Sequence, residues 1–252
     1  MPKKQLLGID VGGTSMKGGL VDPVKGEMVT DRKKILTPQP ATPKAMANVF
    51  AELVNYFDYK GPVGVGFPAI VRRGVAESAT NIDKSWIGTS IEKTFGKHVD
   101  GPVFALNDAD AAGLAEMGFG AGTKVKDGTV ILITIGTGLG AGLFIDGKLV
   151  PNMEFGSMYL RDMKVIAERY VSNKVRKDKE LSWTDFGRRF NTYLQHIERI
   201  FSPDTIILGG GASKSFSEFK DELKLQAKVL PAEMLNKAGT VGAALYAYKK
   251  VK

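Results

Sequence analysis

The sequence predicts an α/β protein, and three observations support this prediction. Short apolar segments typical of strands alternate with longer segments in which apolar residues recur at helical spacing. Several of the predicted strands end directly in glycine-rich loops. No low-complexity linker and no repeat of about 20 to 50 residues interrupts this order. With 252 residues, of which 43% are hydrophobic and 25% charged, the chain can bury the core of one large domain or two smaller ones.

The chain opens with a predicted hairpin. Apolar segments at 6–9 and 18–21 flank a glycine-rich turn, so we expect two strands there. The segment EMVTDRKKILTP (27–38) predicts a further strand. The three prolines of TPQPATP (37–43) exclude regular structure. Thr42-Pro43 is the expected start of a helix whose segment 44–57 has apolar residues at helical spacing.

The rest of the chain continues the alternation of strands and helices. Further strands are expected within residues 61–71, 102–108, 128–138, 140–147 and 204–211. Helices are expected at about 89–96, 109–117, 163–201, 215–227 and 239–250.

Three glycine-rich loops follow predicted strands. Their polar and glycine residues are Asp10, Gly12, Gly13, Thr14 and Lys17; Thr134, Gly136, Thr137 and Gly138; and Gly209, Gly210 and Gly211. Any one of these loops could be a turn selected only for backbone freedom. Together they favour binding of a phosphate chain, because glycines let amides approach an anion and Thr and Lys add donors. The carboxylate of Asp10 could hold a metal ion beside that anion.

A candidate general base follows the predicted strand that ends in PVFALND. Phosphoryl transfer to a hydroxyl needs a carboxylate that orients the hydroxyl and accepts its proton, and Asp108 stands at this strand end. The alternative is that Asp108 only caps the next helix, although Asp110 suits the cap or the first helical turn better. Asn81, Asn107 and Glu154 are candidates for holding the acceptor.

Composition excludes several other classes of function. The absence of Cys excludes disulfides, thiol nucleophiles and Cys-ligated zinc, and it fits a reducing compartment. The chain lacks a run of about 18 apolar residues, and residues 1–4 lead directly into a predicted strand, so we expect a cytoplasmic protein with no membrane partner. The net charge of +8 indicates either a solvated basic surface or an anionic partner such as a nucleotide or polyphosphate. Nucleic acid is not expected, because the sequence has no zinc finger and no RNP-type aromatic strand, and no helix-turn-helix segment ahead of residue 6.

These motifs resemble those of the ROK sugar-kinase family. The matching blocks are Asp10-Val11-Gly12-Gly13-Thr14 with Lys17, Asn107 to Gly113, Thr134 to Gly140, Glu154-Phe155-Gly156 and Gly209 to Gly211. The segments TPQPATP, VGVGFPAIV, SATNIDKSW, DGKLVPN and FSPDTIILGGGASK resemble the members of this family that use polyphosphate to phosphorylate glucose or mannose. The likeness spans roughly residues 5 to 245, in the same order.

The resemblance implies an actin-like ATPase fold of the hexokinase type, related to ribonuclease H, with two α/β domains and an active site in the cleft. The small domain would comprise residues 1–107 completed by the C-terminal helix (239–252), and the large domain residues 108–238. The implied activity is transfer of a phosphoryl group from polyphosphate, ATP or both to the 6-hydroxyl of glucose or mannose. Mg²⁺ is the implied cofactor and a homodimer the implied assembly.

The resemblance also implies roles for individual residues. Asp10, Gly12, Gly13, Thr14 and Lys17 match the first phosphate loop, with Asp10 near Mg²⁺, and Thr134, Gly136, Thr137 and Gly138 match the second. Gly209, Gly210 and Gly211 match the segment near the adenosine or the continuing polyphosphate chain. Asp108 matches the general base and also a sugar-binding position. The other sugar-binding positions correspond to Asn81, Asn107, Glu154 and Ser157.

Two departures from the family pattern affect the expected function. The Cys-rich zinc motif of many ROK proteins is absent, so no structural zinc of that kind is expected. Ser157 stands where the family has His, and Tyr159 stands where this subgroup has Glu. Both family residues are implied sugar contacts, so the alternatives are a kinase for a different hexose and a catalytically weak paralogue that binds sugar or phosphate. A sugar-responsive regulator is disfavoured, because the first predicted strand starts at residue 6 and leaves no DNA-binding domain ahead of it.

Overall fold

The computed structural model describes residues 5–252, and the chain divides into two units. Unit 1 contains the chain up to Phe119 together with Lys237–Lys252, and unit 2 contains Gly120–Asn236. The expectation that residues 1–4 lead directly into a strand falls outside the described residues. Within the described part of the chain, no helix has both the length and the apolar character that crossing a membrane requires.

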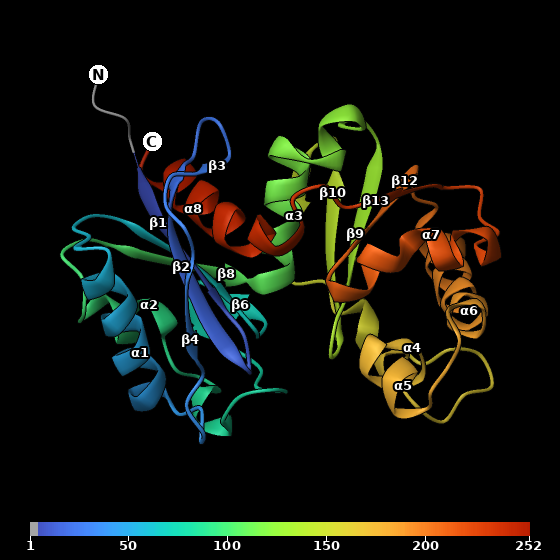
Figure 1. The fold of residues 1–252 in the computed structure, drawn as a ribbon, viewed down its shortest axis with the longest axis horizontal. Coiled ribbons are helices and arrows are strands. Elements are labelled where there is room, and N and C mark those ends of the chain that lie inside the picture. Colours follow the sequence, from blue (N-terminus) through green and yellow to red (C-terminus); the bar gives the residue numbers. More distant parts are fainter. Residues whose placement is uncertain (1–4) are drawn as a thin grey trace. The chain divides into compact units, whose positions relative to one another are not determined.

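Unit 1 is built on a mixed sheet with the strand order β3-β2-β1-β5-β8, and β4 also pairs with β2 (Figure 1). The strands are β1 (Leu6–Val11), β2 (Ser15–Asp22), β3 (Glu27–Met28), β4 (Lys33–Leu36), β5 (Val63–Phe67) and β8 (Val103–Asn107), with β6 (Val71–Arg72) and β7 (Val75–Ala76) forming a separate ribbon. Strands β1, β5 and β8 are parallel, so their carboxyl ends share one edge of the sheet.

Helices cover both faces of this sheet (Figure 1). They are α1 (Pro43–Tyr56), α2 (Ile91–Gly96), α3 (Asp108–Phe119) and α8 (Ala238–Lys250). Thr42 caps α1 by accepting a hydrogen bond from Ala45 N–H, as the Thr-Pro pair predicts. Helix α8 lies close to the strands because Gly8 and Gly64 lack side chains, and a Cβ at either position would collide with the α8 backbone.

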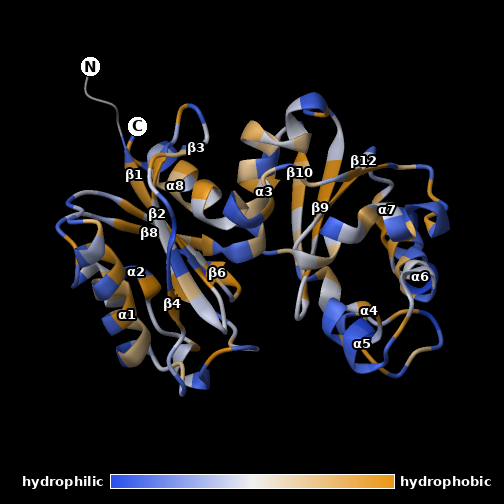
Figure 2. Ribbon diagram, viewed as in Figure 1, coloured by the Kyte–Doolittle hydropathy of each residue, from blue (hydrophilic) through white to orange (hydrophobic). Residues whose placement is uncertain are grey.

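Unit 2 contains a sheet with the strand order β11-β10-β9-β12-β13. Its strands are β9 (Thr129–Ile135), β10 (Leu139–Ile145), β11 (Lys148–Val150), β12 (Thr205–Gly209) and β13 (Lys228–Pro231), and its helices are α4 (Glu168–Val171), α5 (Asn173–Asp178), α6 (Trp183–Phe201) and α7 (Phe216–Phe219). Figure 2 shows hydrophobic residues along the strands of this unit and a largely hydrophilic α5. The apolar face of α6 packs into the core with Phe186, Phe190 and Tyr193.

The structure corrects three of the predicted elements. Residues 27–38 form two short strands, β3 and β4, because the intervening residues turn and Thr30 Oγ1 accepts a hydrogen bond from Leu20 N–H. Residues 163–201 contain three helices, of which only α6 is long. The helix expected over 215–227 ends early, because residues 220–227 lead into β13, an edge strand that pairs with β12.

The boundaries of the two units differ from those of the expected domains. The expected boundary placed residues 108–119 in the large domain, whereas α3 belongs to unit 1. The reason is close packing of α3 on α8, where Gly242 faces the backbone of Ala111 and leaves no room for a Cβ.

Candidate active site

The first glycine loop connects β1 to β2, and the proline-rich segment anchors it. The Thr37 hydroxyl donates to the carbonyl of Gly12 (2.6 Å), the Thr37 N–H donates to that of Thr14 (3.0 Å), and the Gln39 amide donates to that of Gly13 (3.3 Å). These bonds occupy the carbonyl groups of the loop. Within residues 5–252, no protein acceptor bonds the N–H groups of Gly13 and Thr14. Two successive amides can therefore bind an anion.

Asp10 and Lys17 form an ion pair at the base of this loop. They are opposite each other in the β1–β2 register, with 3.2 Å between Lys17 Nζ and Asp10 Oδ2. Gly239 at the start of α8 lies against the carboxyl group, because a Cβ there would be 2.7 Å from Asp10 Cγ. No cluster of three or more His, Asp or Glu side chains that could hold a metal occurs among the residues described. A single carboxylate still suits Mg²⁺, which commonly binds one or two carboxylates together with substrate phosphates.

Asn107, the last residue of β8, caps α3. Its Oδ1 accepts hydrogen bonds from the N–H groups of Ala109 (2.8 Å) and Asp110 (3.1 Å), and its Nδ2 donates to the carbonyl of Ala69 (3.1 Å). The side chain is almost fully buried, and only one amide hydrogen remains for a ligand. Asp110, expected as a cap or a first-turn acid, is a buried first-turn acid.

Asp108 is the first residue of α3 and directly follows the capping residue Asn107. It is half-buried, and its Oδ1 accepts a hydrogen bond from Ala109 N–H (2.9 Å). In the sheet, Asp10 pairs with Gly66 and Gly66 pairs with Leu106, so Asp10 and the end of β8 lie two strands apart, or about 10 Å. Unit 1 thus places the predicted base and the first loop at the same edge of its sheet.

Asn81, a predicted sugar contact, lies beside the first loop. Its backbone carbonyl would be 2.8 Å from a Cβ on Gly13. Its side chain is exposed, and the following residues are anchored by the buried ring of Trp86, whose indole N–H donates to the carbonyl of Ala41 (3.0 Å).

The second glycine loop connects β9 to β10 in unit 2. Gly136 N–H donates to the carbonyl of Gly138 (2.9 Å), and the carbonyl of Gly136 accepts from Asn173 N–H (3.1 Å). Leu139 N–H donates to Glu168 Oε2 (3.0 Å). Across residues 5–252, the N–H groups of Thr137 and Gly138 have no protein acceptor. This loop therefore offers a pair of amides as the first loop does.

The third glycine cluster lies directly beside the second loop. Strands β9 and β12 are parallel, and Gly209 pairs with Thr134. Gly210 has a φ of +79°, and a Cβ at this position would lie 2.5 Å from the backbone nitrogen of Ile135. Both the left-handed backbone and the close approach require glycine there. The structure thus brings together two motifs that are about 75 residues apart in the chain.

The predicted sugar contacts Glu154 and Ser157 flank a short turn that packs on β10. A Cβ on Gly156 would be 2.7 Å from the carbonyl of Leu139, so this turn adjoins the second loop. Surrounding protein atoms partly desolvate the carboxyl group of Glu154, and this desolvation, helped by the negative charge of Glu168, raises its pKa. Glu154 and Ser157 retain solvent contact, and Tyr159 is 64% exposed.

Glu168 is a site residue that sequence reasoning missed. Besides accepting from Leu139, its carboxylate abuts Gly138 and lies near Glu154. The hydroxyl of Tyr193 is buried without a hydrogen-bond partner among the described residues, and burial together with the charge of Glu168 raises its pKa. The only sequence signal is an acid at the start of a short helix, which is too common to indicate a site.

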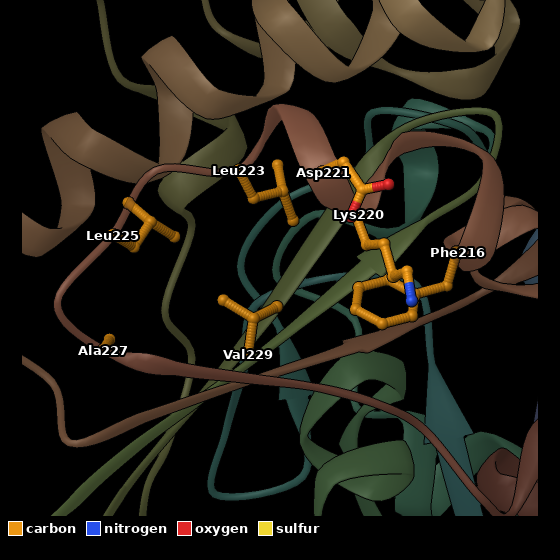
Figure 3. A pocket seen from close by; sticks show the side chains of 7 residues that line it. All are labelled: Phe216, Lys220, Asp221, Leu223, Leu225, Ala227 and Val229. Atoms are coloured by element: carbon orange, nitrogen blue, oxygen red, sulfur yellow. The ribbon is translucent and has the colours of Figure 1, made fainter.

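A pocket of about 340 Å³ lies elsewhere on unit 2 (Figure 3). It is lined by Phe216, Lys220, Asp221, Leu223, Leu225, Ala227 and Val229. None of the predicted site residues contributes to this lining, so the pocket adds no group to the candidate active site.

Comparison with known proteins links this arrangement to sugar kinases. The model of the ROK family matches residues 6–165. A polyphosphate glucokinase of Mycobacterium tuberculosis is 44% identical over 239 residues, which cover 94% of this chain and 89% of the relative. The crystal structure of an inorganic polyphosphate/ATP-glucomannokinase from Arthrobacter sp. strain KM matches with a TM-score of 0.92 and 43% identity, covering 98% of this chain and 99% of the other. A ROK family glucokinase from Streptomyces griseus, solved with glucose and AMPPNP, matches with a TM-score of 0.83 and 25% identity over 97% and 99% of the two chains.

Proposed function

This chain belongs to the ROK family, and on that premise we propose that it is a sugar kinase that transfers a phosphoryl group from polyphosphate or ATP to the 6-hydroxyl of glucose. The similarity to a polyphosphate glucokinase and to a polyphosphate/ATP-glucomannokinase extends over nearly the whole chain. Membership also confirms the predicted actin-like ATPase fold.

The observation that carries the proposal is the matching pair of glycine loops. Each loop offers two successive backbone N–H groups that no protein acceptor bonds within the described residues: Gly13 and Thr14 in unit 1, and Thr137 and Gly138 in unit 2. Successive amides of this kind bind phosphate oxygens. Phosphoryl transfer depends mainly on positioning and on stabilising charge at the phosphate oxygens, which such amides provide.

Asp108 supplies the general base in this proposal. Its carboxylate accepts a hydrogen bond from the sugar 6-hydroxyl and takes the proton as that oxygen attacks the terminal phosphorus. The bond from this phosphorus to the bridging oxygen breaks, and the shortened donor leaves with the bond electrons. The cap provided by Asn107 supports this role, because Asn107 Oδ1 accepts hydrogen bonds from the N–H groups of both Ala109 and Asp110 at the start of α3.

Asp10 would hold Mg²⁺, through water or directly, with Lys17 beside it. When bound, Mg²⁺ neutralises charge on the donor phosphates. Asn81, Glu154 and Ser157 hold the sugar in this proposal, and Glu168 adds a second carboxylate near Glu154. Gly209–Gly211 extend the donor site from the second loop, beside which Gly209 lies.

A kinase for another hexose, mannose above all, is the second candidate function. Ser157 has a shorter reach than the His found in the family, and Tyr159 replaces a carboxylate. A catalytically weak paralogue that binds sugar or phosphate would carry the same substitutions.

Separate assays with each donor test the proposal. Formation of glucose 6-phosphate is followed by a coupled reaction with ATP or polyphosphate as donor, and mannose is tested as the acceptor in parallel. Turnover of glucose with either donor supports the proposal. Binding of sugar without turnover favours the weak paralogue, and turnover of mannose alone favours the second candidate.

The homodimer that the resemblance implies and the cytoplasmic location expected from the sequence are also part of the proposal. Sedimentation of the purified chain at several concentrations tests the dimer, and fractionation of cells that express it tests the location.

A further inference from the structure

A strongly basic segment follows the candidate sugar contacts. Residues 161–179, named the basic segment here, contain seven Lys and Arg residues against three Asp and Glu residues. Its net charge of +4 is half of the +8 of the whole chain, in fewer than one tenth of its residues. All but its first five residues lie outside the part of the chain that the family model matches.

The basic segment is bonded to the second glycine loop at two points. Glu168 accepts a hydrogen bond from Leu139 N–H, and Asn173 N–H donates to the carbonyl of Gly136. Helix α5 starts at Asn173, so its bases follow directly from the loop. Lys177 lies one helical turn beyond Asn173, or about 6 Å along the axis.

Some bases of the segment already have structural partners. Lys174 pairs with Asp178 (2.6 Å). Arg176 donates to the carbonyl of Leu181 (3.1 Å) and lies over the ring of Trp183, 4.0 Å from its centroid. The contacts of Arg176 hold α5 against Leu181 and Trp183, whereas the pair of Lys174 with Asp178 lies within α5; both bases are therefore already occupied.

Arg169, Lys177 and Lys179 differ from these bases. All three are exposed, and none forms an ion pair with any residue in the described part of the chain. Exposed cations attract anions along a surface, and the attraction weakens as salt rises. Three exposed cations without an ion pair in the described residues therefore lie on the segment that is bonded to the second loop, and charge of this kind attracts a long anion.

Building on the proposed function, we propose that the basic segment binds the part of an inorganic polyphosphate chain that extends beyond the phosphates held by the second loop. Arg169, Lys177 and Lys179 contact this extension. ATP has three phosphates and no such extension, so the segment favours long polyphosphate over ATP. The segment thereby determines donor preference without taking part in the chemical step.

Two charge-reversal variants of equal net charge test this inference. The test variant is Lys177→Glu with Lys179→Glu. The control is Lys148→Glu with Lys228→Glu, since both lysines are exposed. Lys148 pairs with Ile145, and Ile145 pairs with Thr129; Lys228 pairs with Thr205, and Thr205 pairs with Val130. The control lysines are therefore at the end of the unit 2 sheet opposite Thr134 and the second loop.

Two measurements are made on each chain. Equilibrium binding of labelled long polyphosphate is measured at several salt concentrations, and initial rates give KM for polyphosphate and for ATP. In the test variant we expect polyphosphate binding to weaken about tenfold at low salt and the ratio of the two KM values to rise similarly. In the control variant, the affinity for polyphosphate and the ratio of the two KM values should each change by less than about twofold.

The inference is overturned if the control variant loses as much polyphosphate binding as the test variant, or if polyphosphate binding is unchanged in the test variant. Binding of a single-stranded RNA of equal charge, with the same loss in the test variant, overturns the assignment to polyphosphate. Since binding is measured without turnover, a chain that binds polyphosphate through the segment but phosphorylates no sugar contradicts the proposed function alone.

Discussion

The two glycine loops have the same role in the proposal, yet the chain anchors them differently. The first loop is held by uncharged donors, the Thr37 hydroxyl and the Gln39 amide, which bond its carbonyl groups. The second is held by the carboxylate of Glu168, which accepts from Leu139 N–H, and by the backbone of Asn173. Both anchors leave two amides without a protein acceptor in the described residues.

This difference determines which of the two loop anchors contains a titratable group. Hydroxyl and amide groups do not titrate in the physiological range, so the anchors of the first loop are independent of pH. Glu168 is charged and contributes to the raised pKa of Glu154. The anchor of the second loop is therefore coupled electrostatically to Glu154, whereas the first loop packs against another predicted sugar contact, Asn81.

The largest expected effect is on the chemical step, and it tests whether Asp108 acts as the base or only supports the start of α3. Asp108→Asn should lower kcat by about 10²-fold or more, because an amide cannot accept the proton. Since Asn107 caps α3, unfolding free energy should change by about 1 kcal/mol or less. Initial rates and denaturant unfolding measure the two quantities. Near-normal turnover in this variant would remove Asp108 from the role of base.

The predicted sugar contacts of unit 2 provide the next prediction. Ser157→His combined with Tyr159→Glu should lower KM for glucose by about tenfold, corresponding to ~1.4 kcal/mol, because both changes restore sugar contacts implied by the family resemblance. KM is measured with glucose and with mannose at saturating donor. If KM for glucose is already low and the double change raises it, these positions are not sugar contacts.

A matched pair of glycine substitutions compares the loops directly. A Cβ at position 13 meets the backbone carbonyl of Asn81, whereas a Cβ at position 138 meets the movable end of the Glu168 side chain. Gly13→Ala should therefore lower kcat/KM for the donor by about fivefold, or ~1 kcal/mol, and Gly138→Ala by less. Donor titrations of both variants measure this. A larger loss in Gly138→Ala would show that the Glu168 anchor is the more rigid of the two.

The smallest expected effect is a shift in titration. Glu168→Gln removes a negative charge near Glu154, so the pKa of Glu154 should fall towards its ordinary value of 4.5. Carbon-detected NMR of the labelled carboxyl groups measures this, with Thr37→Val as the control that disturbs only the first loop. An unchanged Glu154 pKa would show that desolvation alone raises it.

The same shift predicts the pH dependence of stability. The folded protein keeps the Glu154 proton to a higher pH than the unfolded chain does. The contribution of this group to the free energy of unfolding therefore falls as pH rises from 4.5 through the raised pKa. Glu168→Gln should reduce this fall. Denaturant unfolding across that pH range measures it.

Local patterns in the sequence were sufficient for much of the fold. The strand–turn–strand segments around both glycine loops, helix α1 with its Thr42 cap and the terminal helix α8 are confirmed. In these segments, turn chemistry, capping and apolar spacing all act within a few residues, so neighbouring residues determine the outcome.

Contacts between distant segments decided the rest. The strand β13, which no local pattern predicted, forms where residues 228–231 pair with β12, and the helix expected over 215–227 is limited to α7. Asn107, rather than Asp110, caps α3, because the end of β8 directs its side chain onto that helix and onto Ala69. Glu168 adjoins the second loop across 29 residues of sequence, and Gly209 pairs with Thr134 across an even longer separation. The sequence by itself determined which residues are candidates for phosphate chemistry. Only the tertiary structure decided which of them become neighbours, because strand pairing and side-chain packing, not sequence spacing, set those distances.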